Sequence, residues 1–501
     1  MRNIVRDSIL IALLAGAVTH RAPAQGAGSA PDGARATRSA PASDTLKPAA
    51  LSVAGFRNDL LPAVEITGFL VLLNVYDRVA YANEMQDGKK VYSSTFATTW
   101  DHLRTQHWVY DIDPFNTNQF GHPYQGATMY GLSRSSGHGF WTSAVLSDVG
   151  SFVWKMAGET DPPSINDIIT TGQAGSLLGE ALYRMADLVL KDGSVDNKPD
   201  RLHEYAATLI SPPGGLNRRI FGQRFKAKLP DTDPATFWQI RFGATLDALT
   251  RDLTTPTSLL LRRDATAEFA MSYGLPGQPG YAYTRPLDYF DFQGSFLLSS
   301  FSNFIENIMI RGLLVGRKTE GSGNSHGIWG LYGSFDYISP YLFRVSSTAL
   351  SLGTTRQYAI APDVALQGSL LGGVGYGAAG STTVIASTPT NAAIRDYHFG
   401  VTPQGLLALR LLLGDRAMLD LTARDYFVSG TGSDDTRGSE QIFRANFGVT
   451  FRVHGPNGLG VQYVLSTRNA EYGNQPNKKL SEGTITIVYS ILGGRDFSVV
   501  K

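Results

Sequence analysis

The chain has 501 residues, a formal net charge of +1 and no cysteine. The lack of cysteine excludes disulfides, thiolate metal sites and a lipid anchor attached to a cysteine. The balanced charge provides no concentrated basic surface, so we expect no nucleic-acid partner.

The chain opens with the pattern of a secretory signal peptide. Arg2 and Arg6 precede an apolar run from Ile9 to Val18, and residues 22–24 read Ala-Pro-Ala, a small-x-small cleavage pattern. This run is far shorter than the roughly 20 residues that a transmembrane helix needs. We therefore expect residues 1–24 to be removed as a signal peptide and the mature protein to be exported.

The remainder of the chain falls into three parts. Residues 25–50 are rich in Ala, Ser, Gly and Pro and contain hardly any large apolar side chain, which predicts a disordered leader. Across residues 51–234 the apolar positions recur with helical spacing, which predicts a helical domain. Across residues 235–501 they alternate with polar positions, as they do in strands.

The helical part begins with an expected helix at residues 59–82. Its continuous apolar run, Gly68 to Leu73, is too short to cross a membrane, so we expect a buried or interface-lying helix. A loop is predicted at residues 114–121. Pro123 then suits the first position of a helix that runs to about Ser136, because its missing N–H costs nothing there.

Two further helices are expected, one from Gly139 to Gly158 and one that is capped by Asp161 or Ser164. Each carries a stripe of small residues along one face. The stripes are Ser143, Ser147 and Ser151 on the first helix, and Thr171, Gly175 and Gly179 on the second. Small stripes on neighbouring helices permit a close approach of their backbones.

Three motifs occur in order along these helices: NQFGHPYQG at residues 118–126, PSINDIITT at 163–171 and LGE at 178–180. Together they resemble an uncharacterised family of bacterial outer-membrane proteins that is classed only as a domain of unknown function. The resemblance covers about residues 100–184, and Lys155 stands where the family pattern has a glutamate. It implies an envelope protein of Gram-negative-type bacteria with a helical segment before a barrel, and it supplies no activity.

The polar residues of these motifs allow a catalytic interpretation. A hydrolase or transferase that acts on lipid or lipopolysaccharide could use His122 as general base, oriented by Asp167 or Glu159. Ser133, Ser164 or a water would then be the nucleophile.

The alternative is a structural junction, which is the leading interpretation because buried polar groups must be hydrogen-bonded whether or not they catalyse. His122 would cap the helix at Pro123 and bond to Asn166 or Asp167 of the next helix. Glu180 and Arg184 would pair at i, i+4. The predicted junction consists of Asn116, Asn118, His122, Tyr124, Asn166, Asp167, Glu180 and Arg184.

The strand pattern is clearest at residues 441–453, where Phe447, Phe451 and Val453 share one face and arginines stand on the other. A soluble β-sandwich would also alternate. Polar residues on the second face and aromatic residues near strand ends favour a transmembrane barrel with a wet lumen. The expected girdle is Tyr273, Tyr289, Trp329, Tyr337, Tyr341, Phe427 and Tyr489.

We count about twelve strands, an even number as in single-chain bacterial barrels. They are residues 237–247, 264–273, 287–299, 306–317, 327–337, 341–353, 363–376, 396–413, 418–428, 440–453, 459–470 and 482–491. Long and short connections alternate, which predicts that the helical domain lies on the periplasmic side. The connection at residues 339–340 is short where a long external loop is expected, which suggests that one strand near it is miscounted.

The sequence therefore predicts a helical domain followed by a transmembrane antiparallel β-barrel in the outer membrane. We expect a role in structure, assembly or passage of a small molecule rather than catalysis. The alternatives are the lipid-modifying enzyme described above and a docking protein for another envelope component. Outer-membrane lipids and the barrel assembly machinery are the expected partners, and neither a metal nor a cofactor is predicted.

Overall fold

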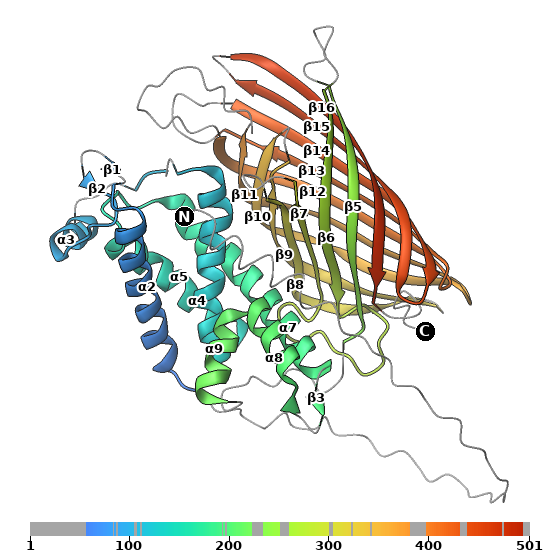
Figure 1. The fold of residues 1–501 in the computed structure, drawn as a ribbon, viewed down its shortest axis with the longest axis horizontal. Helices are drawn as coiled ribbons and strands as arrows, with labels where there is room; N and C mark the ends of the chain where they lie inside the picture. The colour runs from blue at the N-terminus through green and yellow to red at the C-terminus, as the bar shows by residue number, and fades with distance from the viewer. Residues whose placement is uncertain are drawn as a thin grey trace, which may run out of the picture.

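The fold is described from a computed structural model of the chain (Figure 1). The described residues are 57–83, 85–86, 89–104, 108–110, 113–192, 194–195, 198–222, 234–250, 260–299, 304–321, 324–340, 343–380, 397–430, 438–472 and 475–493. The expected signal peptide and leader lie outside these residues.

The helical part consists of α-helices joined by short segments, with two π-helical turns inside them. The helices are α2 (Leu61–Ala80), α3 (Phe96–Arg104), α4 (His122–Ser135), α5 (Phe140–Ala157), α6 (Ile165–Ile168), α7 (Gly175–Asp192), α8 (Arg201–Ile210) and α9 (Pro212–Phe221). The π-turns are η1 (Thr117–Gly121) and η2 (Ile169–Ala174), and two small hairpins pair β1 (Met85–Gln86) with β2 (Lys89–Lys90) and β3 (Ser194–Val195) with β4 (Lys198–Pro199). None of the helices in the described ranges combines the length and the apolar character needed to cross a membrane.

The loop expected at residues 114–121 is wrong in part, because η1 runs directly into α4. Pro123 still lies in the first turn of α4, but the preceding residues are already wound. The second π-turn, η2, likewise joins α6 to α7. Each π-turn shifts the angular position of the side chains that follow it, and such turns are frequent at functional sites.

The backbones of α4 and η2–α7 touch, so the stripe of Thr171, Gly175 and Gly179 packs closely on α4 and not on the serine stripe of α5. A Cβ atom on Gly126 would lie 1.7 Å from the carbonyl oxygen of Thr171, and one on Gly175 would lie 2.7 Å from the Cα atom of Gly126. On the other side of α4, the Ser147 hydroxyl donates to the Gly126 carbonyl at 3.0 Å. The three helices therefore form one tightly packed unit.

Twelve antiparallel strands pair in chain order, and β16 pairs with β5 to close the barrel. They are β5 (Thr236–Thr250), β6 (Leu260–Tyr273), β7 (Phe290–Leu297), β8 (Ile305–Glu320), β9 (Ser325–Ile338), β10 (Arg344–Ala361), β11 (Val364–Gly380), β12 (Tyr397–Leu413), β13 (Ala417–Val428), β14 (Gly438–His454), β15 (Asn457–Tyr472) and β16 (Gln475–Leu492). The predicted fold class and strand number are confirmed. The short connection at residues 339–340 does not mark a miscounted strand, because β9 and β10 are fully paired on both sides of it.

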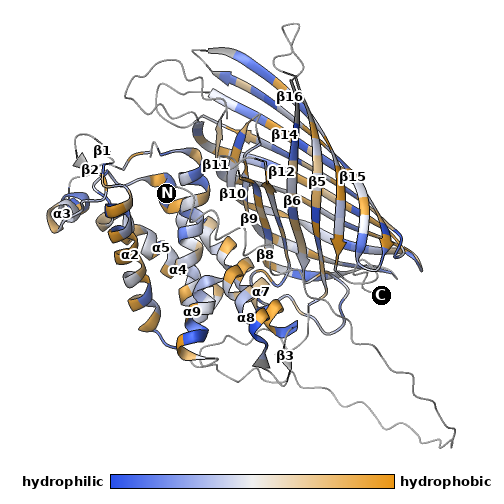
Figure 2. Ribbon diagram, in the orientation of Figure 1, coloured by the Kyte–Doolittle hydropathy of each residue, from blue (hydrophilic) through white to orange (hydrophobic). Residues whose placement is uncertain are grey.

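Apolar and polar residues alternate along the strands (Figure 2), and many of the apolar ones are exposed on the outer wall. The outward side chains of Phe447, Phe451 and Val453 are exposed, as predicted. Arg444, on the opposite face of β14, points inward and donates to Ser466 and Glu306. The exposed outward side chains of the other strands form a belt that suits the hydrocarbon layer of a membrane.

The helical domain lies beside the barrel, against the outer wall of β6 to β12, and not within the lumen (Figure 1). Leu177 of α7 packs over Gly333 of β9, where an added Cβ would approach it to 3.0 Å. Phe115 stacks near Tyr337 of β9 with ring centroids 5.7 Å apart. Helical side chains thus cover outward faces of strands that lipid would otherwise meet.

This packing corrects part of the expected aromatic girdle. Tyr273 and Tyr337 are buried beneath helices, and Tyr289 faces the lumen. Trp329, Phe427 and Tyr489 remain exposed on the outer wall, and Tyr341 lies outside the described residues. Alternation in the sequence identifies an outward aromatic residue, but it cannot tell whether lipid or protein covers that residue.

The contact between Gly126 and η2 predicts a large effect of a single methyl group. Gly126→Ala is expected to lower the free energy of unfolding by about 1–3 kcal/mol or more, because the new Cβ has no room beside the Thr171 carbonyl. Gly68→Ala on α2 is the control: its Cβ meets nothing within 4 Å, so helix propensity should raise stability by up to about 1 kcal/mol. Urea titration in detergent micelles measures both, and equal effects would contradict the packing described.

Candidate functional site

The first polar cluster lies around His122 at the start of α4 and Asp167 of α6. The Nε2 atom of His122 lies 3.5 Å from Asp167 Oδ2, and its Nδ1 atom lies 3.3 Å from Gln125 Oε1. Asn166 donates to Asp167 Oδ1 at 2.6 Å, and the Ser164 hydroxyl donates to the other oxygen. His122 thus contacts the next helix through Asp167, and it does not cap α4, whose N-cap is Gly121.

Lys155 of α5 completes this cluster. Its Nζ atom lies 2.6 Å from Asp167 Oδ2 and 2.7 Å from Glu159 Oε2, so one ammonium group links two carboxylates. The indole N–H of Trp154 donates to Glu159 Oε1 at 2.6 Å. Lys155 was noted in the sequence only as a departure from the family pattern, yet in the structure it supplies the central positive charge.

η1 and the segment before it connect this cluster to the barrel. Asn118 donates to the Tyr397 hydroxyl of β12 at 2.7 Å, and that hydroxyl donates to the Asp113 carbonyl at 2.6 Å. Burial raises the pKa of the Asp113 carboxyl to about 6, and His122 partly opposes this rise. Two other residues of the predicted junction lie apart: Asn116 accepts from the backbone N–H of Thr117, and Tyr124 stacks on Phe120.

The arrangement around His122 lacks the geometry of a nucleophilic site. His122 is 7% exposed, and Ser164 directs its hydroxyl to Asp167 instead of to the imidazole. Ser133 is fully buried on α4. Within the described part of the chain, no group of three or more His, Asp or Glu side chains is arranged to hold a metal ion. The cluster therefore resembles a packed polar junction more than a catalytic site.

A second cluster is fully buried between α4, α7 and the barrel. Glu180 accepts from Arg134 at 2.7 and 3.1 Å, from Arg184 at 2.8 Å and from the Tyr130 hydroxyl at 2.8 Å. Arg184 also donates to Asp288 at 3.0 Å, in the connection between β6 and β7. Although burial opposes ionisation, the two guanidinium groups lower the pKa of Glu180 to about 2.

The sequence suggested only half of this second cluster. The Glu180 and Arg184 pair follows from helical spacing, and it forms. Arg134 and Asp288 were missed, because they are 46 and 104 residues from their partners and nothing local marks them. The structure also shows that the predicted junction residues form two separate clusters, one around Asp167 and one around Glu180.

The barrel interior has polar cavities between two apolar layers. Side chains that include Phe237, Ile328, Leu412, Met418 and Leu492 pack together near the end with the short turns. A second layer lies toward the opposite end and is formed by Met309, Ile338, Phe343, Val345, Ala379, Tyr426, Val428 and Ile442. Two cavities between them have about 730 and 860 Å³ of atom-free space and share Gln293, Thr422 and Arg424 as lining.

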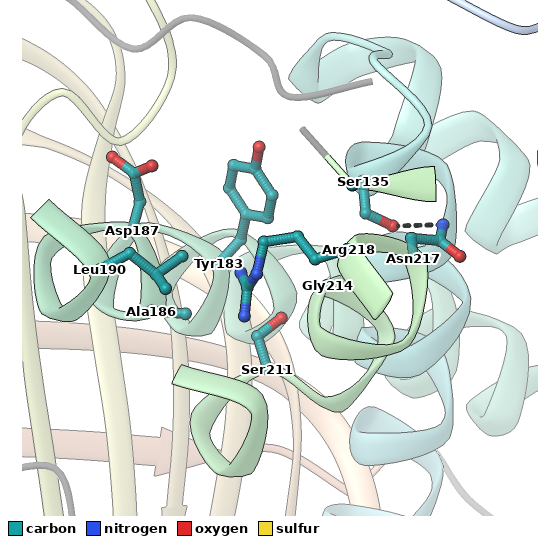
Figure 3. Close-up of a pocket in the computed structure, with 10 residues that line it drawn as sticks. Ser135, Tyr183, Ala186, Asp187, Leu190, Ser211, Gly214, Asn217 and Arg218 are labelled. Carbon is teal, nitrogen blue, oxygen red and sulfur yellow. Dashed lines mark hydrogen bonds between the residues drawn. The ribbon is translucent and has the colours of Figure 1, made fainter. Parts of the chain in front are cut away.

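A further groove lies between α4, α7 and α9 (Figure 3). Asn217 donates to the Ser135 hydroxyl at 2.8 Å across one side of it, and Arg218 and Tyr183 extend along it. None of the candidate catalytic residues, His122, Asp167, Ser164 and Glu159, lines this groove or the two barrel cavities.

Removal of one member of the Glu180 cluster is expected to be costly. Asp288→Asn leaves the buried Arg184 without its second carboxylate, and a broken buried ion pair typically costs about 3–5 kcal/mol. Asp59→Asn removes the partner of Arg57 in an exposed pair and should cost less than about 1 kcal/mol. Urea unfolding in micelles compares the two, and a small effect at Asp288 would show that water compensates Arg184.

The raised pKa of Asp113 predicts a pH-dependent effect. A carboxyl with a folded pKa of about 6, above its usual 3.8, favours the fold while it is protonated, and this contribution is lost as pH rises through 6. Asp113→Asn, which mimics the neutral form, should therefore raise stability at pH 8 and leave it unchanged at pH 4. A loss of stability at pH 8 would mean that attraction to His122 or Lys155 outweighs burial. Thermal unfolding at the two pH values is the measurement.

Comparison with known proteins adds a family match to this geometry. A family model described as a domain of unknown function, DUF3943, matches residues 107–213. This confirms the expected family for that part of the chain. None of the curated proteins that were compared matches the chain.

Several solved structures are similar to parts of the chain. The NanC porin has a TM-score of 0.25 and 6% identity over 50% of this chain and 98% of that one. A loop-deletion mutant of the outer membrane protein OmpT of Vibrio cholerae has a TM-score of 0.21 and 8% identity over 51% and 98%. The toluene transporter TodX of Pseudomonas putida has a TM-score of 0.21 and 8% identity over 53% and 90%. The chain is therefore a closed twelve-stranded antiparallel β-barrel with an apolar outer belt, and residues 107–213 of its helical part match the domain of unknown function DUF3943.

Proposed function

We propose that the barrel anchors the helical domain in the outer membrane, with the outer helices α2 and α5 in contact with lipid acyl chains. One observation carries this proposal: the helical domain takes the place of lipid on part of the barrel wall while its own outer surface is apolar. The function is then structural. The apolar layer near the short turns of the barrel favours this structural role over a pore through which small molecules diffuse freely.

The contacts of the domain span the height of the barrel wall. Asn118 meets Tyr397 at the start of β12, which is the end of the barrel with the long connections. Arg184 meets Asp288 beyond the end of β6, which is the end with the short turns. Since the strands between these ends cross the hydrocarbon layer, a domain that touches both ends lies alongside that layer.

Helix α2 presents apolar side chains away from the rest of the domain. Val64, Leu72 and Val79 are 61, 70 and 77% exposed. Its only exposed charged side chain is Arg78, in the last turn. Glu65 and Asp77 are at least partly buried, and Glu65 accepts from Asn217.

Helix α5 has the same character. Trp141, Val145 and Val149 are exposed along one face, and neither charged residue of the helix is exposed. Lys155 is held by two carboxylates, and Asp148 packs against Gly172. Large contiguous apolar surfaces of this kind mark interaction sites, because exposure to water is unfavourable. The exposed apolar belt on the wall of the same barrel supports lipid as the partner of these helices.

This proposal bears on the other expectations from the sequence. The periplasmic placement of the helical domain stays a prediction, and it is the competing outcome of the test below. Insertion by the barrel assembly machinery is proposed from the barrel class alone. The enclosure of His122 offers no support to the lipid-modifying alternative, and no partner protein is needed to explain an apolar surface that lipid can cover.

The absence of cysteine from the chain makes a direct test possible. Leu72→Cys and Val145→Cys each place one polarity-sensitive fluorophore on α2 or α5 of the full chain in phosphatidylcholine vesicles. Lipids brominated on their acyl chains should quench both labels as strongly as they quench a label at Ile487→Cys, on the exposed outer wall of β16. A label at Glu204→Cys, on the exposed charged face of α8, should be quenched weakly.

The two reference positions make each outcome informative. If the labels at residues 72 and 145 behave like the one at residue 204, the domain lies in water and the anchoring proposal fails. If the label at residue 487 is itself unquenched, the barrel wall does not meet lipid, and the proposal fails at its first step.

A further inference from the structure

Arg424 of β13 lies where the cavities of the barrel interior meet. It lines both large cavities and also a third, smaller one that Arg311 of β8 lines as well. Arg424 is only 6% exposed, so its guanidinium group is held inside the lumen and not in bulk water. The inward direction follows from alternation, because Thr422 and Tyr426 on the same face of β13 also line these cavities.

These two arginines lack acceptors among the described residues. The Nε atom of Arg424 and the Nε and Nη1 atoms of Arg311 are buried without a hydrogen-bond partner. Buried donors in native proteins are almost always satisfied by protein, ordered water or a ligand. Two neighbouring guanidinium groups also repel each other. A bound anion would both accept hydrogen bonds from the free donors and reduce this repulsion.

The carboxylates of the cavity nearer the short turns are already engaged. Asp420 accepts from Arg410 at 2.7 Å and from Arg241 at 3.0 Å. Asp291 accepts from two hydroxyl groups, those of Ser272 and Tyr289. The charged side chains that line this cavity are Arg311, Arg356, Arg410, Arg424, Asp291 and Asp420, four positive and two negative.

The other large cavity has more carboxylates than arginines, because Asp264, Glu268, Glu306 and Glu482 line it beside Arg424 and Arg444. Glu306 pairs with Arg444 at 3.1 Å, and Glu268 pairs with Arg241 at 3.3 Å. In the third cavity Asp336 accepts from the Tyr426 hydroxyl at 2.8 Å, while its Oδ1 atom is buried without a hydrogen-bond partner. The free donors at Arg311 and Arg424 remain without a partner beside these carboxylates.

We propose that the barrel interior binds a small oxyanion, a carboxylate or phosphate group, between Arg311 and Arg424. The planar guanidinium group presents parallel donors that match two oxygens of such an anion, which favours oxyanions over halide ions. The apolar layers on either side lower the local dielectric constant and strengthen the attraction. This site is independent of the anchoring role, because it lies inside the barrel and not on its wall.

Inorganic phosphate is the probe for this site. Thermal unfolding of the full chain in detergent micelles is measured at rising phosphate concentration, with sodium chloride at equal ionic strength as the reference. A ligand of the folded state raises the unfolding temperature as its concentration rises. We expect phosphate to raise it beyond chloride.

The variants identify the residues responsible. Arg424→Gln is expected to need at least about tenfold more phosphate for the same shift, because hydrogen bonds to a charged group are lost. Arg219→Gln removes the same charge from the exposed surface of α9 and should leave the phosphate response unchanged. Arg311→Lys keeps the charge but loses the parallel donors of the planar guanidinium group. If Arg424→Gln does not fold, a weaker phosphate response of Arg311→Lys is the expected result. Equal shifts from phosphate and chloride, or an unaltered phosphate response in the folded variants, would overturn the proposal.

Discussion

The outward face of a closed barrel in a membrane must be covered by apolar material around its whole circumference. Pairing of β16 with β5 gives the N–H and C=O groups of both edge strands their hydrogen-bond partners. The apolar cover must then come from side chains. Part of the wall meets it with an exposed belt, and part meets it with helices, where Leu177 and Phe115 cover β9. The position of the helical domain, the burial of its charges and the apolar character of its outer helices all follow from that contact.

Charged groups at this contact are possible only because they are paired. Glu180 lies between two guanidinium groups, and Arg184 extends the cluster to Asp288 in the barrel. A buried ion pair contributes little net stability, but a single unpaired partner is costly, so such a pair disfavours other alignments of the same surfaces. The cluster therefore fixes how α7 lies on the wall, while the surrounding apolar packing supplies the affinity.

Local patterns predicted the barrel well and the site poorly. Alternation identified all twelve strands, and the stripe that contains Gly175 predicted a close backbone approach but not that α4 would be the partner. The same alternation could not show which outward residues lie under helices. An outward residue such as Tyr337 occupies the same alternating position whether lipid or a helix covers it. The π-turns carry no periodic signal, and the partners of Glu180 are too distant in the chain to be paired by spacing. The sequence predicts that His122 caps α4 and hydrogen-bonds Asn166 or Asp167, whereas the structure has Gly121 as the cap and His122 at 3.5 Å from Asp167, and local patterns do not bring Lys155 or Asp113 into this cluster.

The shared core of the two parts has a consequence for biogenesis. Phe115, Leu177 and Ala181 belong to the same buried cluster as Phe290, Phe335 and Phe399 of the barrel, so neither set can be buried without the other. The helical segment is synthesised first, yet the barrel residues of this shared core lie along the chain from β6 to β12 and are made only later. Burial of the helical residues is therefore completed only when those strands have paired, and any factor that holds the chain before then must shield these side chains.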